Sequence, residues 1–156
     1  MDGIYTLRFP VPPSAIDAND HVNNIAYLQW MQDVAIAHTT AVGWPPERYF
    51  ELGAAWVARS HFIEYLRPAF LGEPIALHTW IEAMDRRRCP RHYAFVREGD
   101  GKRDVLARAK TEWVYVDLKS GRPTTIPAIM AESFPLVSME HAEAALGIAK
   151  PKLMRE

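Results

Sequence analysis

The sequence predicts an α+β fold in which one antiparallel sheet wraps around a single long central helix. Apolar residues between Val22 and Val42 recur with the 3.6-residue period of a helix, whereas four later segments alternate with the two-residue period of strands. The breaks between those later segments are short, and parallel crossovers need about a dozen residues or more, so antiparallel pairing is expected. We expect one domain, residues 1–156, because domains commonly have about 100–150 residues.

The first elements in chain order are a short strand and the long helix. The strand is expected at residues 4–11, because Pro12 and Pro13 stop it. The helix is expected at residues 22–42, since Gly43 followed by prolines is a typical helix end. Only a narrow stripe of this helix is predicted to face away from protein: Ile25, Gln29, Gln32, Asp33, Ile36 and Thr40.

The remaining strands are expected where β-branched and aromatic residues alternate with polar ones, at residues 54–66, 75–84, 91–98 and 104–118. A short helix is expected in the tail that begins at Ala128. One helix cannot cover both faces of such a sheet. We therefore expect a second copy to pair sheet edge to sheet edge, which gives a homodimer or homotetramer.

Composition narrows the class of protein. The net charge of −1 and the pI near 6.6 argue against a nucleic-acid-binding surface, which usually carries a basic excess. The single cysteine, Cys89, excludes an intrachain disulfide framework. Neither a signal-peptide pattern at the N-terminus nor a run of about 18 apolar residues occurs, so we expect a cytoplasmic protein without a membrane partner.

Polar residues crowd the start of the predicted helix, at residues 17–24. One interpretation is helix capping, which needs only one such residue, Asp20 or Asn23. The other is a reaction site, because a helix N-terminus carries partial positive charge and free N–H groups that stabilise an oxyanion. In that case Asp17 would act as nucleophile or general base near the N–H groups of Asn24 and Ile25.

Three segments resemble the hotdog-fold thioesterases. D-A-N-D-H-V-N-N-I-A-Y-L-Q-W (17–30) is similar to the D-x-x-G-H-V-N-N-x-x-Y pattern of the 4-hydroxybenzoyl-CoA and acyl-CoA thioesterase group, and closer still to that of acyl-carrier-protein thioesterases. FIEYLRPAFLGEPIALHTWIEAM (62–84) and ARAKTEWVYVDLKSGRPTTIP (107–127) resemble later family motifs in the family's order. The resemblance covers most of the chain and implies the hotdog fold.

By position, the resemblance implies that Asp17 is the catalytic acid and that the Asn24 N–H polarises the thioester carbonyl. It also implicates Asn19 and His21, which match catalytic residues of the acyl-carrier-protein enzymes. Two departures stand out: Asp20 replaces the glycine of the CoA group, and Leu66-Arg67-Pro68-Ala69 lacks the further acid or cysteine of the carrier-protein group. A complete three-residue mechanism is therefore not carried over.

The expected reaction is hydrolysis of acyl-CoA or an acyl-carrier-protein thioester to free acid and thiol, with no cofactor and no metal. Asp17, from its own or a neighbouring subunit, either activates water or attacks directly. Two alternatives remain open: a binding or sensing protein without catalysis, and a dehydratase or hydratase that acts on the acyl chain. Thioester turnover distinguishes the three.

Two sets of residues are candidates for substrate binding. Arg86, Arg87, Arg88 and Arg91 form the best basic patch for the phosphates of CoA, because guanidinium binds two oxygens at once; the alternative is a solvated turn. An acyl tunnel, or simply the core, is the expected environment of Tyr27, Trp30, Met31, Val34, Trp56 and Phe62. His38 lies on the apolar face of the helix, where a hydrogen-bonded core histidine is the expected role.

Overall fold

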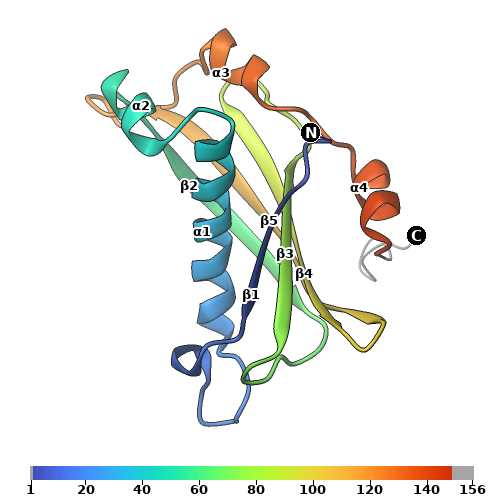
Figure 1. Cartoon of the computed structure of the whole chain (residues 1–156). Helices are drawn as coiled ribbons and strands as arrows, with labels where there is room; N and C mark the ends of the chain where they lie inside the picture. Colours follow the sequence, from blue (N-terminus) through green and yellow to red (C-terminus); the bar gives the residue numbers. More distant parts are fainter. Residues whose placement is uncertain (1, 149–156) are drawn as a thin grey trace.

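The sheet has five strands in the order β1-β3-β4-β5-β2, and every neighbouring pair is antiparallel (Figure 1). The computed structural model describes residues 2–148, so the last eight residues of the predicted tail lie outside the described part. The strands are β1 (Tyr5–Pro10), β2 (Ala54–Tyr65), β3 (Pro74–Ile81), β4 (Arg88–Gly99) and β5 (Lys102–Asp117). The α+β prediction and the antiparallel pairing are confirmed.

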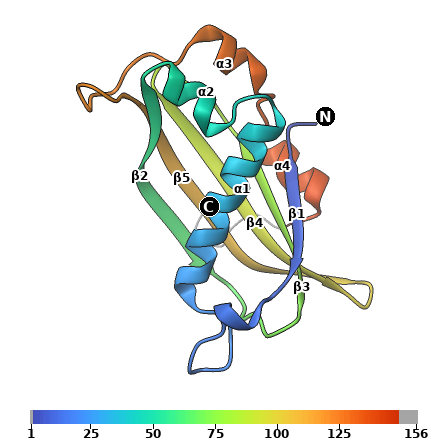
Figure 2. The same ribbon diagram turned by 60° about the vertical axis from the view of Figure 1, so that its left-hand side comes forward.

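The long helix, α1 (Asn24–Ala41), lies along one face of this curved sheet (Figure 2). Its exposed positions are those of the predicted stripe together with Asn24 and Ala41 at the helix ends, and Ile25 and Ile36 are 74% and 48% exposed. The residues of α1 that face the sheet are buried. The helix therefore has one face on the sheet and one face to solvent, as its 3.6-residue hydrophobic period predicted. The helix begins two residues later than expected, because Asn23 is its cap.

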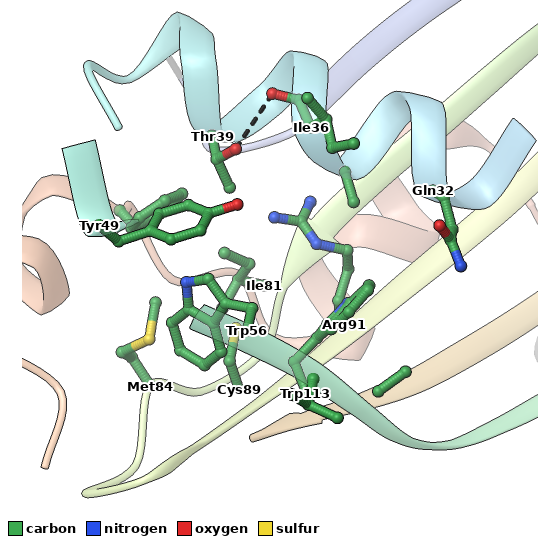
Figure 3. A pocket seen from close by; sticks show the side chains of 14 residues that line it. Gln32, Ile36, Thr39, Tyr49, Trp56, Ile81, Met84, Cys89, Arg91 and Trp113 are labelled. Atoms are coloured by element: carbon green, nitrogen blue, oxygen red, sulfur yellow. Dashed lines mark hydrogen bonds between the residues drawn. The ribbon is translucent and has the colours of Figure 1, made fainter. Parts of the chain in front are cut away.

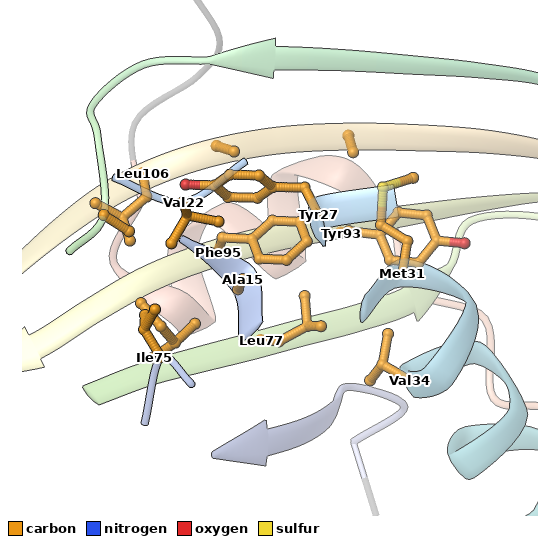
Figure 4. Packing of buried hydrophobic residues seen from close by; sticks show 14 residues of the cluster. Ala15, Val22, Tyr27, Met31, Val34, Ile75, Leu77, Tyr93, Phe95 and Leu106 are labelled. Atoms are coloured by element: carbon orange, nitrogen blue, oxygen red, sulfur yellow. The ribbon is translucent and has the colours of Figure 1, made fainter. Parts of the chain in front are cut away.

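The main core lies between α1 and the sheet (Figure 4). Tyr27 and Met31 from the helix pack against Leu77, Tyr93 and Phe95 from the strands, and none of these five is more than 3% exposed. Burying such a side chain contributes roughly 1.5–3 kcal/mol. Of the residues expected in an acyl tunnel or the core, Met31 and Val34 belong to this core, whereas Phe62 is exposed.

The chain covers part of the outer sheet face itself. Helix α4 (Met139–Leu146) packs Ala142 and Leu146 against Trp80, Ala94 and Val96 of β3 and β4 (Figure 1). The expectation that a second copy must supply this cover is therefore wrong for β3 and β4. Strands β1 and β2 remain as the two sheet edges.

Two further features differ from the prediction. Strand β4 begins at Arg88 rather than residue 91, because Arg88, Cys89 and Pro90 pair in register with Val114, Trp113 and Glu112. Two short helical segments were not predicted, η1 (Pro13–Ala15) and α2 (Pro46–Glu51), whereas α3 (Ala128–Ser133) and α4 lie in the tail where a short helix was expected. Helices α2 and α3 lie together at the end of the sheet where α1 finishes (Figure 1).

Candidate active site

The polar segment before α1 forms a tight loop closed by its own hydrogen bonds. The Asp17 N–H donates to the carbonyl of His21 (3.0 Å), and the Asp20 N–H donates to the carbonyl of Asp17 (3.1 Å). The Asn19 N–H donates to Oδ1 of Asp17 (2.8 Å), which fixes the direction of that carboxylate. Asp20 has a φ of +62°, a left-handed conformation that suits glycine and that aspartate tolerates better than most residues.

The first turn of α1 leaves one backbone N–H available. Oδ1 of Asn23 accepts from the N–H of Ile25 (2.8 Å), so Asn23 is the cap and the expected use of the Ile25 N–H toward substrate is wrong. Among the described residues, the N–H of Asn24 has no acceptor. This N–H lies at the positive end of the helix dipole, where it can stabilise negative charge on an oxygen.

A cavity of about 240 Å³ adjoins this helix start. The hydroxyl of Tyr65, on β2, donates to the carbonyl of Asn24 (2.9 Å), and its ring lies 5.2 Å from that of Tyr27. Burial, and next the neighbouring Tyr65, raises the pKa of Tyr27 to about 12. The lining residues are His21, Val22, Asn24, Tyr27, Tyr65, Leu66, Arg67 and Pro68.

The structure brings only some of the predicted residues into this cavity. His21, Asn24 and Tyr27 line it, whereas Asp17 is half-buried in the adjoining loop and Asn19 is exposed at the turn. The lining role of Tyr65 was missed, although residues 62–84 carried one of the family motifs. The side chain of Ile25 points to solvent and does not line the cavity.

An ion-pair network stabilises the wall of the smaller cavity that the residues after β2 form. The guanidinium of Arg97 contacts Glu73 (3.0 Å) and Asp104 (3.0 Å) and donates to the carbonyl of Pro68 (3.2 Å). The N–H of Val22 donates to the carbonyl of Ala69 (2.9 Å). The segment after β2 is thus fixed both to the sheet and to the loop that carries Asp17.

A larger cavity of about 390 Å³ lies beside the second half of α1 (Figure 3). Trp56 is the one expected tunnel residue that lines it. The walls are mainly apolar, and the exposed members Gln32, Ile36 and Val57 show that it opens between α1 and β2. Its apolar lining includes Tyr49, Trp56, Ile81, Met84, Trp113 and Phe134.

Arg91 belongs to this larger cavity and not to a surface patch. The residue is 2% exposed, and its Nη1 donates to Nδ1 of His38 (2.9 Å) and to Oγ1 of Thr79 (3.0 Å). The predicted grouping of Arg91 with Arg86–Arg88 is therefore wrong, because β4 turns Arg91 toward α1. His38 has the expected core role: burial, and next Arg91, lowers its pKa from 6.5 to about 3.

The other arginines meet at a groove of about 380 Å³. Arg87 and Arg88 line it together with Arg59 of β2, which the sequence analysis did not select. Arg86 does not line the groove; its carbonyl accepts from the N–H of Ile126 (2.9 Å), which holds the β3–β4 connection in place. The groove includes Val57, so only the edge strand β2 separates it from the larger cavity.

The two cavities lie toward opposite ends of α1. The helix start is at the end of the sheet where β2 finishes, whereas Arg91 and the β3–β4 connection lie nearer α2 and α3 (Figure 1). At 1.5 Å rise per residue, positions 36–39 lie about 20 Å along the helix from Asn24. Within one chain the helix N-terminus and the arginine cavity are thus separate.

None of the helices in residues 2–148 has the length and apolar character needed to cross a membrane. Over the same residues, histidine, cysteine and acidic side chains form no group of three or more that could hold a metal ion.

Comparisons with known proteins give a consistent result. The family model for the thioesterase-like superfamily matches residues 11–134. The L-carnitine dehydrogenase/betainyl-CoA thioesterase of Rhizobium meliloti (strain 1021) is 30% identical over 123 residues, which is 78% of this chain. The chain spans about a quarter (24%) of the length of that relative.

Solved structures show the same fold. A 4-hydroxybenzoyl-CoA thioesterase mutant in complex with 4-hydroxybenzoyl-CoA aligns with a TM-score of 0.79 at 17% identity, covering 85% of this chain and 99% of that one. A 1,4-dihydroxy-2-naphthoyl-CoA thioesterase from Synechocystis aligns with a TM-score of 0.76 at 18% identity, covering 84% and 95%. The hotdog fold expected from the motifs is confirmed.

Proposed function

Because this chain belongs to the thioesterase-like superfamily, we propose that it hydrolyses acyl-CoA thioesters to the free acid and the thiol. The observation that carries the proposal is the available N–H of Asn24 at the start of α1, next to a cavity and to the loop that carries Asp17. A thioester carbonyl that points at this N–H develops negative charge where the helix dipole stabilises it.

The proposed reaction uses the side chains around that N–H. Asp17 either removes a proton from an attacking water or attacks the carbonyl carbon to form a mixed anhydride that water then hydrolyses. In both routes the C–S bond breaks, the thiolate leaves with the electron pair, and water supplies the new acid oxygen. His21 lines the cavity and is placed to orient the water, with Asn19 holding the Asp17 carboxylate through its N–H.

We propose that two copies pair through β2. This strand is a 12-residue sheet edge with exposed apolar residues such as Val57, Phe62 and Tyr65, and exposed edges of this kind favour pairing. Antiparallel pairing about the middle of β2 would set Tyr65 of one copy opposite Ala54 of the other. Each helix start would then lie close to the arginine cavity of the other copy, which gives the site an acyl pocket.

The groove with Arg59, Arg87 and Arg88 is the proposed site for the phosphates of CoA. Three guanidinium groups, from β2, the β3–β4 connection and β4, suit an extended polyanion. Arg59 lies near the middle of β2, so pairing through this strand would bring the grooves of both copies close together.

The test is free-thiol release from a panel of acyl-CoAs, from acetyl to palmitoyl, with benzoyl- and betainyl-CoA included. Asp17→Asn should lower kcat by at least about 100-fold, because it removes the nucleophile or base and keeps the size of the side chain. Asp33→Asn is the matched control, since Asp33 is exposed on α1 and accepts a hydrogen bond from Gln29. Unchanged turnover in Asp17→Asn would refute the catalytic role. Binding of acyl-CoA without any turnover would favour a binding protein.

A further inference from the structure

We propose that the larger cavity binds a carboxylate at the far end of the acyl group, so that the preferred substrates are mono-CoA thioesters of dicarboxylic acids. The inference rests on the proposed function and names its substrate class. The residue that carries it is Arg91, whose guanidinium reaches into the cavity from β4 while Tyr49 reaches in from α2 (Figure 3).

One edge of the Arg91 guanidinium is available. Both of its hydrogen bonds, to His38 and Thr79, come from Nη1. In the part of the chain that the structure describes, Nη2 and Nε have no acceptor. These two nitrogens form the edge of the guanidinium that binds both oxygens of a carboxylate in parallel.

Among residues 2–148 the other buried arginine has a carboxylate beside it, whereas Arg91 does not. Arg108, 5% exposed, lies 3.7 Å from the carboxylate of Glu143. No carboxylate in residues 2–148 forms an ion pair with Arg91, and none lines its cavity. A buried charge without a counter-charge is costly, and a substrate carboxylate would remove that cost.

The neighbours of Arg91 fix the orientation of its guanidinium. His38 can accept from Nη1 only when its Nδ1 carries no proton, and Thr79 accepts while its own hydroxyl donates to the carbonyl of His92 (2.9 Å). The guanidinium is therefore fixed before any ligand arrives. A fixed bidentate donor selects an anion of matching geometry and lowers the entropy lost on binding.

The rest of the cavity suits the carbon chain of a diacid. Its volume of about 390 Å³ lies in the range of small-ligand sites, and Trp56, Met84 and Trp113 provide apolar contact for methylene groups. A cationic acyl group would meet Arg91 without an acid to offset the repulsion. A plain aliphatic acyl group would leave the guanidinium buried and without a counter-charge.

The experiment compares two acyl-CoAs of equal chain length, glutaryl-CoA and pentanoyl-CoA. Betainyl-CoA is included as a substrate with a cationic acyl group. Wild type should favour glutaryl-CoA over pentanoyl-CoA by at least about tenfold in kcat/KM, because only glutaryl-CoA can form a charged, hydrogen-bonded pair with Arg91. Arg91→Met should lower kcat/KM for glutaryl-CoA about 100-fold and abolish the preference for glutaryl-CoA over pentanoyl-CoA. Arg91→Lys should fall between, since lysine keeps the charge and loses the fork.

Arg8→Gln is the matched control, because Arg8 lies on β1 in an exposed ion pair with Glu98 and outside both cavities. A circular-dichroism spectrum like that of wild type reports that Arg91→Met is folded. Equal preference for the two substrates, or a preference for betainyl-CoA, would overturn the inference while hydrolysis itself stands.

A binding measurement keeps the inference testable if no thioester turns over, the result that would refute the proposed function. Glutarate should change the fluorescence of the cavity tryptophans, Trp56 and Trp113, in wild type and in Arg8→Gln. Arg91→Met should weaken this binding at least tenfold. Equal binding by wild type and Arg91→Met would show that Arg91 does not hold the carboxylate.

Discussion

His38 and Arg91 show how two buried polar residues can depend on each other. His38 is 1% exposed and its ring lies 5.3 Å from that of Tyr5, so a proton on the imidazole would have neither water nor a counter-charge. It would also face the guanidinium that donates to Nδ1. Burial, and next Arg91, therefore lowers the pKa of His38 to about 3, and the folded protein keeps this histidine neutral.

The first prediction concerns the pH dependence of stability. Between pH 7 and pH 5 the unfolded chain protonates His38, with an ordinary pKa of 6.5, while the folded chain does not. Unfolding therefore becomes easier as the pH falls, and His38 should lower the free energy of unfolding by about 2 kcal/mol over this interval. The variant His38→Gln should lack this contribution, because glutamine offers Arg91 an acceptor and does not titrate.

Denaturant unfolding of both proteins at equal concentration measures the difference. His78, whose pKa burial lowers to about 4, is present in both and cancels. Wild-type and His38→Gln curves that run parallel between pH 7 and pH 5 would contradict the assignment.

The residues before α1 could be found from sequence, whereas Arg91 could not be placed correctly. Asp17 and Asn24 belong to a local motif, so their relative positions follow from a few bonds. Arg91 follows three arginines in the sequence, and that proximity suggested one surface patch. Alternate residues of a strand share one face, so Arg91 lies on the same face of β4 as the buried Cys89, Tyr93 and Phe95. This alternation was the signal that Arg91 faces inward.

At the scale of elements, the cap of α1 bears on whether the polar residues 17–24 serve as a helix cap or as a reaction site, the two interpretations that the sequence left open. Asn23 satisfies the Ile25 N–H, so a single residue caps the helix. The Asn24 N–H remains free of any acceptor in the described chain, and the other polar residues belong to the loop around Asp17. Capping therefore leaves free the N–H group that the proposed catalysis would use.

The second prediction tests this cap. Asn23→Ala should lower the free energy of unfolding by about 1 kcal/mol, because it leaves the Ile25 N–H without its acceptor. Asn23→Ser should restore most of the loss, since serine is also a good cap. Gln29→Ala, an exposed position on α1, should change stability by less than about 0.5 kcal/mol. Equal effects of Asn23→Ala and Gln29→Ala would refute the capping role.

The order of the main elements was predictable because each follows from a local period. The period of α1 and the alternation of the strands persist over many residues. Helix α2 was missed because it has only six residues and because the prolines before it were read as a stop signal alone. Pro46 is also a favoured first residue of a helix, and it begins α2.

At the scale of the whole molecule, the sequence could not show which residues lie far apart. The β3–β4 connection, with its arginines, lies at the opposite end of the sheet from the start of α1 (Figure 1). The cover of the outer sheet face by α4 was also unpredictable, because it depends on contacts between β3, β4 and a distant tail segment. Long-range packing of this kind has no local sequence period.

The third prediction is complementation between subunits. If Asp17 of one copy serves the arginine cavity of the other, Asp17→Asn and Arg91→Met subunits should restore activity toward glutaryl-CoA when mixed and allowed to exchange. Random assortment makes half of the dimers mixed, each with one unaltered site, so turnover should reach about a quarter of wild type. A mixture no more active than the average of the two variants would place both residues of a site in one chain.

The distance between the two cavities also bears on how this protein can evolve. The groups proposed to break the thioester bond lie on the loop and first turn of α1, whereas the proposed acyl pocket takes its walls from the later half of α1, α2, the residue after α3 and the sheet. Mutations that reshape the pocket therefore leave the bond-breaking groups in place. A lineage with this fold can exchange one acyl substrate for another by drift in the pocket and need not lose hydrolysis on the way.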